Sequence, residues 1–126
     1  KTKKQNFLQM AEKTRIIDIY EKSGRFTSYF RKFTGQKKDY NYSDLSLLRQ
    51  LFSNEKARLL HAIKLQKPTS IYALAKFLAR DFKSVREDIL LLKKFGFVEL
   101  VEEKVNNRIT HKPLLTATSV NIVIRI

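Results

Sequence analysis

The chain has no cysteine and no tryptophan, and only three glycines, two prolines and one methionine occur among its 126 residues. The absence of cysteine excludes disulfides and thiolate metal sites, and it makes a reducing cytoplasm the simplest compartment. Three glycines leave no glycine-rich loop that could cradle a phosphate. No apolar run approaches the roughly 18 residues that span a bilayer. We therefore expect a soluble, cytoplasmic protein.

Groups suited to catalysis are equally scarce. The two histidines, His61 and His111, are fifty positions apart, and neither has a second histidine or a carboxylate at metal-ligand spacing. Glu87 and Asp88 are adjacent, but adjacent side chains on a helix point about 100° apart and do not form a catalytic pair. The sequence therefore predicts no enzyme, no metal site and no cofactor.

What the chain has in excess is positive charge. Lysine and arginine number 26 against 12 aspartates and glutamates, which gives a formal net charge of +14. Residues 1–40 carry 11 basic and 4 acidic side chains, residues 41–79 carry 6 and 2, and residues 80–126 carry 9 and 6. Solubility alone does not require such a surplus, so we expect binding to a polyanion with help from the basic N-terminal segment.

The apolar spacing predicts two consecutive helices in the second half of the chain. Ser70 can cap a helix whose buried face recurs at i, i+3, i+4 and i+7, formed by Ile71, Leu74, Ala75 and Leu78. After a short turn, Asp81 can cap a second helix that runs from Phe82 to Phe95. This second helix has Val85, Ile89 and Leu92 inward, and its first turns present Lys83, Ser84, Arg86 and Glu87.

A basic hairpin is predicted to follow the second helix. Gly96 suits the positive φ found after a helix, and residues 97–102 alternate apolar and acidic side chains as a half-buried strand does. Asn106 and Asn107 tolerate the left-handed conformation that a hairpin turn needs. The return strand is expected near residues 108–111, with Lys104 and Arg108 at the tip of the hairpin.

Residues 40–112 resemble the winged-helix core of small prokaryotic DNA-binding regulators of the MarR and ArsR type. They are most similar to a group of short archaeal and bacterial regulators. The resemblance rests on Leu74-Ala75, Arg80-Asp81, Val85, Asp88-Ile89, Leu92 and Phe95-Gly96-Phe97-Val98. It implies a winged helix-turn-helix fold and duplex DNA as the ligand.

Three departures from the family pattern bear on this implication. Ala79 stands where such turns often carry glycine, and a positive φ there would cost on the order of 1 kcal/mol. Glu87 replaces a residue that is often basic, and a carboxylate there could accept from cytosine N4 but would also repel phosphate. Leu90 and Leu91 stand where relatives tend to carry polar or basic side chains.

The first forty residues are less distinctive. Residues 7–20 favour a helix, although residues 16–20 alone are also compatible with a strand. Aromatic side chains beside basic residues then fall at helical spacing and predict a further helix: Phe26, Tyr29, Phe30 and Phe33. Such a stripe is more often core or a dimer seam than a platform for unpaired bases. A polar linker is expected over residues 34–39.

Further elements are expected on both sides of the motif. Residues 40–42 alternate as a short strand does, and Ser43 or Asp44 caps a helix with Leu45, Leu48, Leu51 and Phe52. Ser53 begins another helix, which Lys67-Pro68 ends. The closing residues 120–126 predict a strand whose edge needs a partner. That partner is expected within the chain, for example residues 40–42, or else in a second copy.

These elements predict a mainly α fold with a small β-wing (α+β). We expect a winged helix-turn-helix domain over residues 40–126, with a C-terminal strand, preceded by a basic helical extension over residues 1–39. The predicted function is that of a DNA-binding transcriptional regulator acting as a homodimer. Its helix 82–95 would enter a major groove and its basic wing 103–108 would reach the flanking backbone. The expected DNA contacts are Lys83, Ser84, Arg86, Glu87, Lys93, Lys94, Lys104, Asn106, Asn107 and Arg108.

Two alternatives stay open at this point. An RNA-binding winged helix would depend more on the aromatic and basic helix over residues 25–33 than on the wing. A protein-interaction or antitoxin-type winged-helix module would place Leu90 and Leu91 on a contact face. The sequence pattern names no small-molecule effector.

Overall fold

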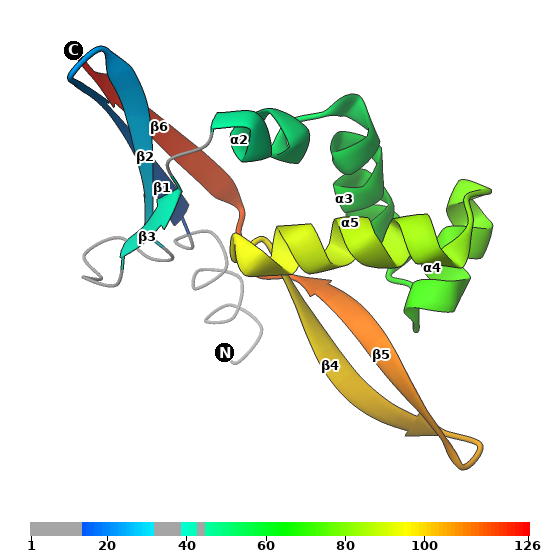
Figure 1. Ribbon diagram of the computed structural model, residues 1–126. Helices are drawn as coiled ribbons and strands as arrows, with labels where there is room; N and C mark the ends of the chain where they lie inside the picture. Colours follow the sequence, from blue (N-terminus) through cyan, green and yellow to red (C-terminus); the bar gives the residue numbers. More distant parts are fainter. Residues whose placement is uncertain (1–13, 32–38, 43–44) are drawn as a thin grey trace. The chain divides into compact units, whose positions relative to one another are not determined.

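The computed structural model describes residues 14–31, 39–42 and 45–126. The chain divides into two compact units, whose elements are labelled in Figure 1. Unit 1 is the described part of Lys1–Gln50 together with Thr116–Ile126, and unit 2 is Leu51–Leu115. The division therefore falls near residues 50 and 115, whereas the sequence suggested a boundary at residue 40. The C-terminal strand belongs with the N-terminal strands.

Unit 1 is built on a four-stranded sheet. Its strands are β1 (Thr14–Lys22), β2 (Arg25–Arg31), β3 (Asp39–Tyr42) and β6 (Ser119–Arg125). The order across the sheet is β3-β2-β1-β6, in which β6 runs parallel to β1 and the other pairs are antiparallel. The central strand β1 is rich in β-branched residues and buries Ile17 and Ile19.

A two-residue turn joins β1 to β2. Ser23 and Gly24 both have positive φ, 54° and 80°, as the tight turns that connect twisted antiparallel strands require. The backbone N–H of Gly24 donates to Oε2 of Glu21 at 2.8 Å. This turn sets the register in which Lys22 faces Arg25.

The predicted mainly α fold with an N-terminal helical extension is wrong. The described residues contain six strands in two sheets beside four helices, so the fold is a β-rich α+β fold and not a mainly α winged helix. Residues 14–22 and 25–31 are strands, where helices over 7–20 and 26–33 were expected. Residues 7–13, 32–33 and the linker 34–38 lie outside the described residues. The helical spacing of four aromatics was misleading because the Ser23-Gly24 turn and a long-range partner decide the conformation.

That long-range partner is the C-terminal strand. The expected pairing of this strand within the chain is confirmed, although its neighbour is β1 and not residues 40–42. Ile17 lies opposite Ile122, and the hydroxyls of Thr14 and Ser119 are hydrogen-bonded at 2.9 Å. Residues 40–42 are confirmed as part of a strand, β3, which pairs with β2.

Two charged residues are buried in β1. Nη2 of Arg15 donates to the backbone oxygen of Thr116 at 3.0 Å, and burial lowers the pKa of the Arg15 guanidinium. The Asp18 carboxylate lies 3.9 Å from Nη2 of Arg125, whose guanidinium also stands 5.8 Å from the centre of the Tyr20 ring. These contacts, together with the strand pairing, hold β6 against β1.

Helix α2 (Leu45–Leu51) lies where the two units divide, and it buries Leu48 and Leu51. The expected helix over this stretch is confirmed. Its expected caps, Ser43 and Asp44, lie outside the described residues.

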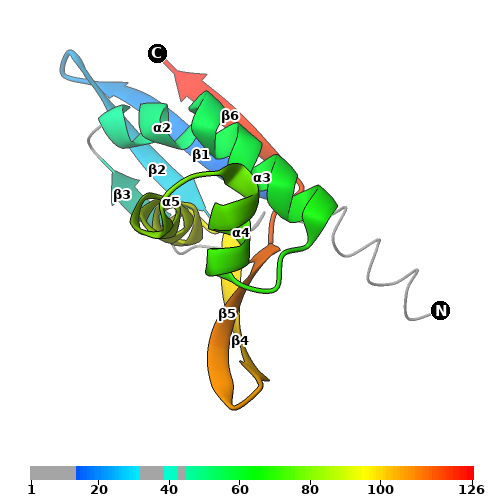
Figure 2. The same cartoon turned by 90° about the vertical axis from the view of Figure 1, so that its right-hand side faces the viewer.

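Unit 2 consists of three helices followed by a hairpin. The elements are α3 (Asn54–Gln66), α4 (Ile71–Leu78), α5 (Phe82–Lys94), β4 (Val98–Val105) and β5 (Arg108–Leu115). Figure 2 shows the hairpin extending away from the three helices of its unit. These local elements lie where the sequence predicted them, except that both hairpin strands are longer. Helix α3 is capped by Ser53 and ends at Lys67, which has φ 46°, just before Pro68.

The core of unit 2 lies between the helices and the base of the hairpin. Its fully buried apolar side chains come from every helix of the unit, from the C-cap of α5 and from the second half of β5: Leu59, Leu74, Val85, Ile89, Leu92, Phe95 and Pro113. Burial of each large apolar side chain contributes roughly 1.5 to 3 kcal/mol. Because all three inward positions predicted for α5 are in this core, the opposite side of α5 is left to solvent.

Candidate nucleic-acid interface

The turn between α4 and α5 fixes the start of α5. Ser70 caps α4 by accepting from the backbone N–H of Ala73 at 3.0 Å. Helix α4 then ends at Ala79, which has φ 55° and ψ 42°, so the left-handed conformation predicted as a cost at this position is present. Two residues later Asp81 begins α5. The whole change of direction takes three residues, which leaves the first turn of α5 at the surface.

Asp81 caps α5 as predicted. Its two carboxylate oxygens accept from the backbone N–H of Ser84 at 2.9 Å and from the Ser84 hydroxyl at 2.8 Å. Both hydrogen bonds favour the ionised carboxylate, so they hold the pKa of Asp81 below its usual value, and the nearby charge of Arg80 acts in the same direction. The predicted contact residue Ser84 is therefore engaged in the helix cap.

An ion-pair cluster ties α5 to α3. Asp88 lies 3.2 Å from Nζ of Lys56 on α3 and 2.9 Å from Nη1 of Arg80 in the turn. The side chains of Lys56 and Asp88 are mostly buried. Removing one member would leave a charge without its partner in a largely desolvated place, so the cluster favours one position of α5 on α3. This cluster was not predicted from the sequence, in which the available signal was an aspartate at the edge of the buried stripe of α5.

The hairpin presents basic and polar groups in a defined register. Asn106 and Asn107 form the turn with φ 51° and 62°, as predicted. Val105 then pairs with Arg108, and Glu102 pairs with His111. Nε2 of His111 lies 3.8 Å from Oε2 of Glu102, and both side chains are largely exposed. Lys104 is exposed one position before the end of β4.

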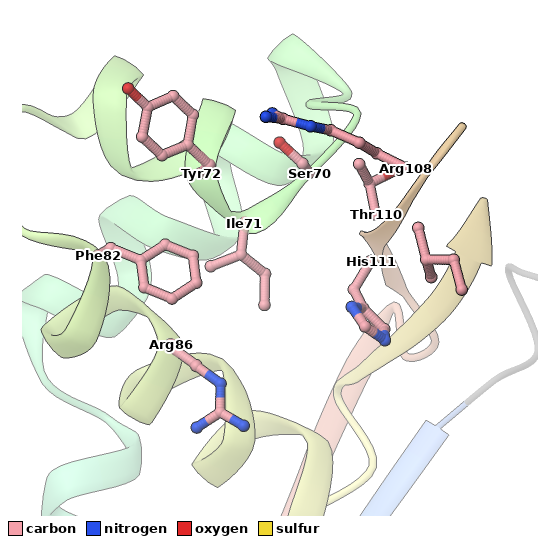
Figure 3. A pocket seen from close by; sticks show the side chains of 9 residues that line it. Ser70, Ile71, Tyr72, Phe82, Arg86, Arg108, Thr110 and His111 are labelled. Atoms are coloured by element: carbon pink, nitrogen blue, oxygen red, sulfur yellow. The ribbon is translucent and has the colours of Figure 1, made fainter. Parts of the chain in front are cut away.

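A hollow of about 300 Å³ lies within unit 2, where α4, α5 and β5 face one another (Figure 3). Its lining side chains come from the start of α4, the first turns of α5 and the first half of β5: Ser70, Ile71, Tyr72, Phe82, Arg86, Arg108, Ile109, Thr110 and His111. None of these described lining residues carries a carboxylate. The lining therefore combines two guanidinium groups, an imidazole and three hydroxyls with apolar side chains, which suits an anion attached to a flat apolar group.

The hollow brings together only two of the predicted contact residues, Arg86 and Arg108. The others stand elsewhere on unit 2. Exposed positions along α5 are taken by Lys83, Glu87, Lys93 and Lys94, and exposed positions at the hairpin end by Lys104, Asn106 and Asn107. Tyr72 and Phe82 also line the hollow and were not predicted to do so. The signal was available, because both are large aromatics outside the buried stripes of their helices, with 65% and 46% of their surface exposed.

Three further features of the described residues bear on other kinds of site. Among residues 14–31, 39–42 and 45–126, no cluster of three or more histidine, aspartate or glutamate side chains is placed to hold a metal ion. No helix within this described part of the chain combines the length and apolar character needed to cross a membrane. A second hollow, of about 200 Å³, is lined by Glu55, Arg58, Leu78 and Arg80, so it mixes both signs of charge.

Unit 2 thus consists of three helices and a hairpin, and α4, α5 and β5 line a hollow that holds two arginines. The chain belongs to the HVO_A0114 family, whose model matches residues 51–122. The matched stretch contains the whole of unit 2 and the first residues of β6. No curated protein matches the chain.

Proposed function

We propose that the protein is a DNA-binding transcriptional regulator that reads duplex DNA through α5 and the β4–β5 hairpin. The observation that carries the proposal is the hollow lined by both Arg86 of α5 and Arg108 of β5, in which none of the described lining residues carries a carboxylate. Guanidinium groups form paired hydrogen bonds with phosphate and with guanine, so a site with two of them and an outward helix suits a nucleic-acid groove.

In the proposed mode of binding, α5 enters a major groove, which is wide enough to admit a helix. Its first turns would approach the base edges with Lys83 and Arg86, while Asp81 and the buried stripe hold the helix on the unit. Glu87 is exposed on the same helix but is not among the residues that line the hollow. We therefore assign base contact to Arg86 before Glu87.

The hairpin would hold the flanking backbone. Arg108 directly follows the two-asparagine turn, Lys104 is separated from it by Val105, and both are exposed. Lys93 and Lys94 at the end of α5 would add phosphate contacts. Such contacts supply affinity and orientation but little sequence information. Because they are electrostatic, binding is expected to weaken steeply as salt is raised.

The net charge of +14 supports a polyanionic ligand for the molecule as a whole. The cytoplasm is the compartment that we propose for this activity, and the homodimer expected of such regulators stays a prediction. The RNA-binding alternative depended on an aromatic and basic helix over residues 25–33. Residues 25–31 form strand β2, so this helix is not present there.

The proposal is tested by competition. A labelled duplex pool bound to the protein is titrated with unlabelled duplex DNA, single-stranded DNA and single-stranded RNA of the same sequences. Duplex is expected to compete best. Arg86→Ala should flatten the preference among different duplexes, whereas Lys104→Ala should weaken binding to all of them alike.

Arg58→Ala is the matched control, because it removes the same charge from a hollow that lies elsewhere on unit 2. It should leave both affinity and preference close to those of the unmodified protein. Better competition by single strands would favour the RNA or single-strand alternative and overturn the proposal. Absence of binding to every nucleic acid, with Leu90 buried in a complex with another protein, would favour an interaction module.

A further inference from the structure

Phe82 is unusual for the first residue of a helix on a basic surface. The residue is 46% exposed, and its ring points toward Ile71 in the hollow (Figure 3). It does not belong to the buried stripe of α5, which consists of Val85, Ile89 and Leu92. An exposed phenyl ring gains nothing from phosphate, so its position calls for an apolar partner in the ligand.

From this we infer that the first turns of α5 select a thymine and a guanine within about two base pairs of each other, read by Phe82 and Arg86. The inference rests on the proposed function and specifies the DNA feature that the same site would choose.

The spacing of the two side chains fits neighbouring base pairs. Phe82 and Arg86 are four residues apart, hence about 6 Å apart along the helix axis and about 40° apart around it. Both line the same hollow, which agrees with their shared side of α5. Base pairs follow one another every 3.4 Å, or roughly two steps in 6 Å. The two side chains therefore reach base edges that are one or two pairs apart.

The chemistry of each side chain selects one base. In the major groove the C5-methyl group of thymine is the apolar feature of the base edges, and a phenyl ring can contact it without leaving a polar edge unpaired. Arginine has donors only, and its fork matches the N7 and O6 acceptors of guanine. Cytosine offers a donor at the same place, so Arg86 would disfavour it.

The neighbouring groups are compatible with this assignment. Arg108, Thr110 and His111 face the same hollow from β5 and can hold backbone phosphate while α5 approaches the bases. Asp81 is engaged with Ser84, so its carboxylate is already used in the helix cap. Among the described residues, Glu102 is the acid that pairs with His111, and it stands on β4, outside the lining of the hollow.

The test begins with a pool of random duplexes from which the protein selects its preferred sequences. We expect the selected duplexes to share a thymine and a guanine no more than two base pairs apart. In one selected duplex, that thymine is then replaced by deoxyuridine, which lacks only the methyl group. In a second duplex, the guanine is replaced by 7-deazaguanine, which lacks only the N7 acceptor.

For the unmodified protein, loss of the methyl group should weaken binding about fourfold, the factor that corresponds to one buried CH₂ group. Loss of N7 should weaken it by about fivefold or more. Phe82→Ala should bind the thymine and deoxyuridine duplexes equally while still discriminating against 7-deazaguanine, and Arg86→Ala should show the reverse. Phe77→Ala, which removes an exposed aromatic of α4 that does not line the hollow, should keep both discriminations.

A substitution of Phe82 by glutamine tests whether the preference for a base can be changed and not only removed. Glutamine at position 82 can pair with adenine N6 and N7, so Phe82→Gln should move the selected base from thymine to adenine. The inference is overturned if the selected duplexes do not share a thymine and a guanine within two base pairs of each other. It is also overturned if Phe82→Ala still binds the thymine duplex more tightly than the deoxyuridine duplex. Failure of the proposed function is a distinct result, because then no duplex would be enriched at any salt concentration.

Discussion

Ala79 is a non-glycine residue in the left-handed conformation, at the point where the chain leaves α4. The left-handed conformation costs a residue with a Cβ about 1 to 2 kcal/mol, whereas glycine adopts it freely. Glycine also has more conformational freedom in the unfolded chain, and this entropy offsets about half of the free energy gained by relieving the left-handed strain. Ala79→Gly is therefore expected to raise the free energy of unfolding by about 0.5 to 1 kcal/mol.

Urea denaturation followed by circular dichroism measures this change. Ala57→Gly is the matched control, because Ala57 is an exposed residue within α3, where glycine should cost about 1 kcal/mol. Equal loss of stability in both variants would show that residue 79 is not held in the left-handed conformation.

Single residues with strong local preferences were the most predictable part of the chain. The caps Ser70 and Asp81 and the turn Asn106-Asn107 were recognised because each depends only on its neighbours in sequence. The pairing of Asp88 with Lys56 was missed, because it depends on which helix packs against α5. Tyr72 and Phe82 stand outside the buried stripes of their helices, but that pattern does not show that they share a hollow, which exists only once β5 is in place.

Helix α5 depends on the ionised form of its cap, which gives its stability a pH dependence. The pKa of Asp81 is lowered in the folded protein, so folding favours the ionised carboxylate. This contribution is complete above the unfolded-state pKa of about 3.9 and is lost as the pH falls through the lower folded-state pKa. Asp81→Asn keeps a capping side chain that does not titrate.

The measurement compares the free energies of unfolding of the unmodified protein and Asp81→Asn from pH 7 to pH 2. The difference between them should be constant near neutral pH and shrink below about pH 4. A difference that stays the same over the whole range would mean that Asp81 is not stabilised as an anion in the folded protein.

Among the elements, those of unit 2 were predicted well and those of unit 1 were not. Helices α3, α4 and α5 each combine a cap with a clear apolar stripe, so local pattern suffices. Strands β1 and β2 are adjacent segments whose apolar spacing fits both helical and extended periods. Their conformation is decided by pairing, and β1 pairs with β6, about a hundred residues away in sequence. Only the Ser23-Gly24 turn could have indicated a hairpin there.

At the scale of the whole molecule, the described residues form one unit built on a four-stranded sheet and another built of three helices and the β4–β5 hairpin. Strand β6 ends the order of the described sheet, and it exposes Ile122, Val123 and Ile124. Pairing with β1 provides backbone hydrogen-bond partners along one edge of this strand. Pairing within the chain was predicted from the sequence, but β1 was not predicted as the neighbour. The binding site was anticipated in part: Arg86 and Arg108 were named, while the aromatic and imidazole groups beside them were not.

The central claim is that the hollow of unit 2 is a phosphate-contacting part of a DNA-binding surface. Its most direct test is the dependence of duplex affinity on salt concentration for the unmodified protein, Arg108→Ala and Arg58→Ala. Each phosphate contact adds about 0.9 to the slope of log affinity against log salt. Arg108→Ala should reduce the magnitude of the slope by about 1, and Arg58→Ala should leave it unchanged. Equal slopes for all three proteins would contradict the claim.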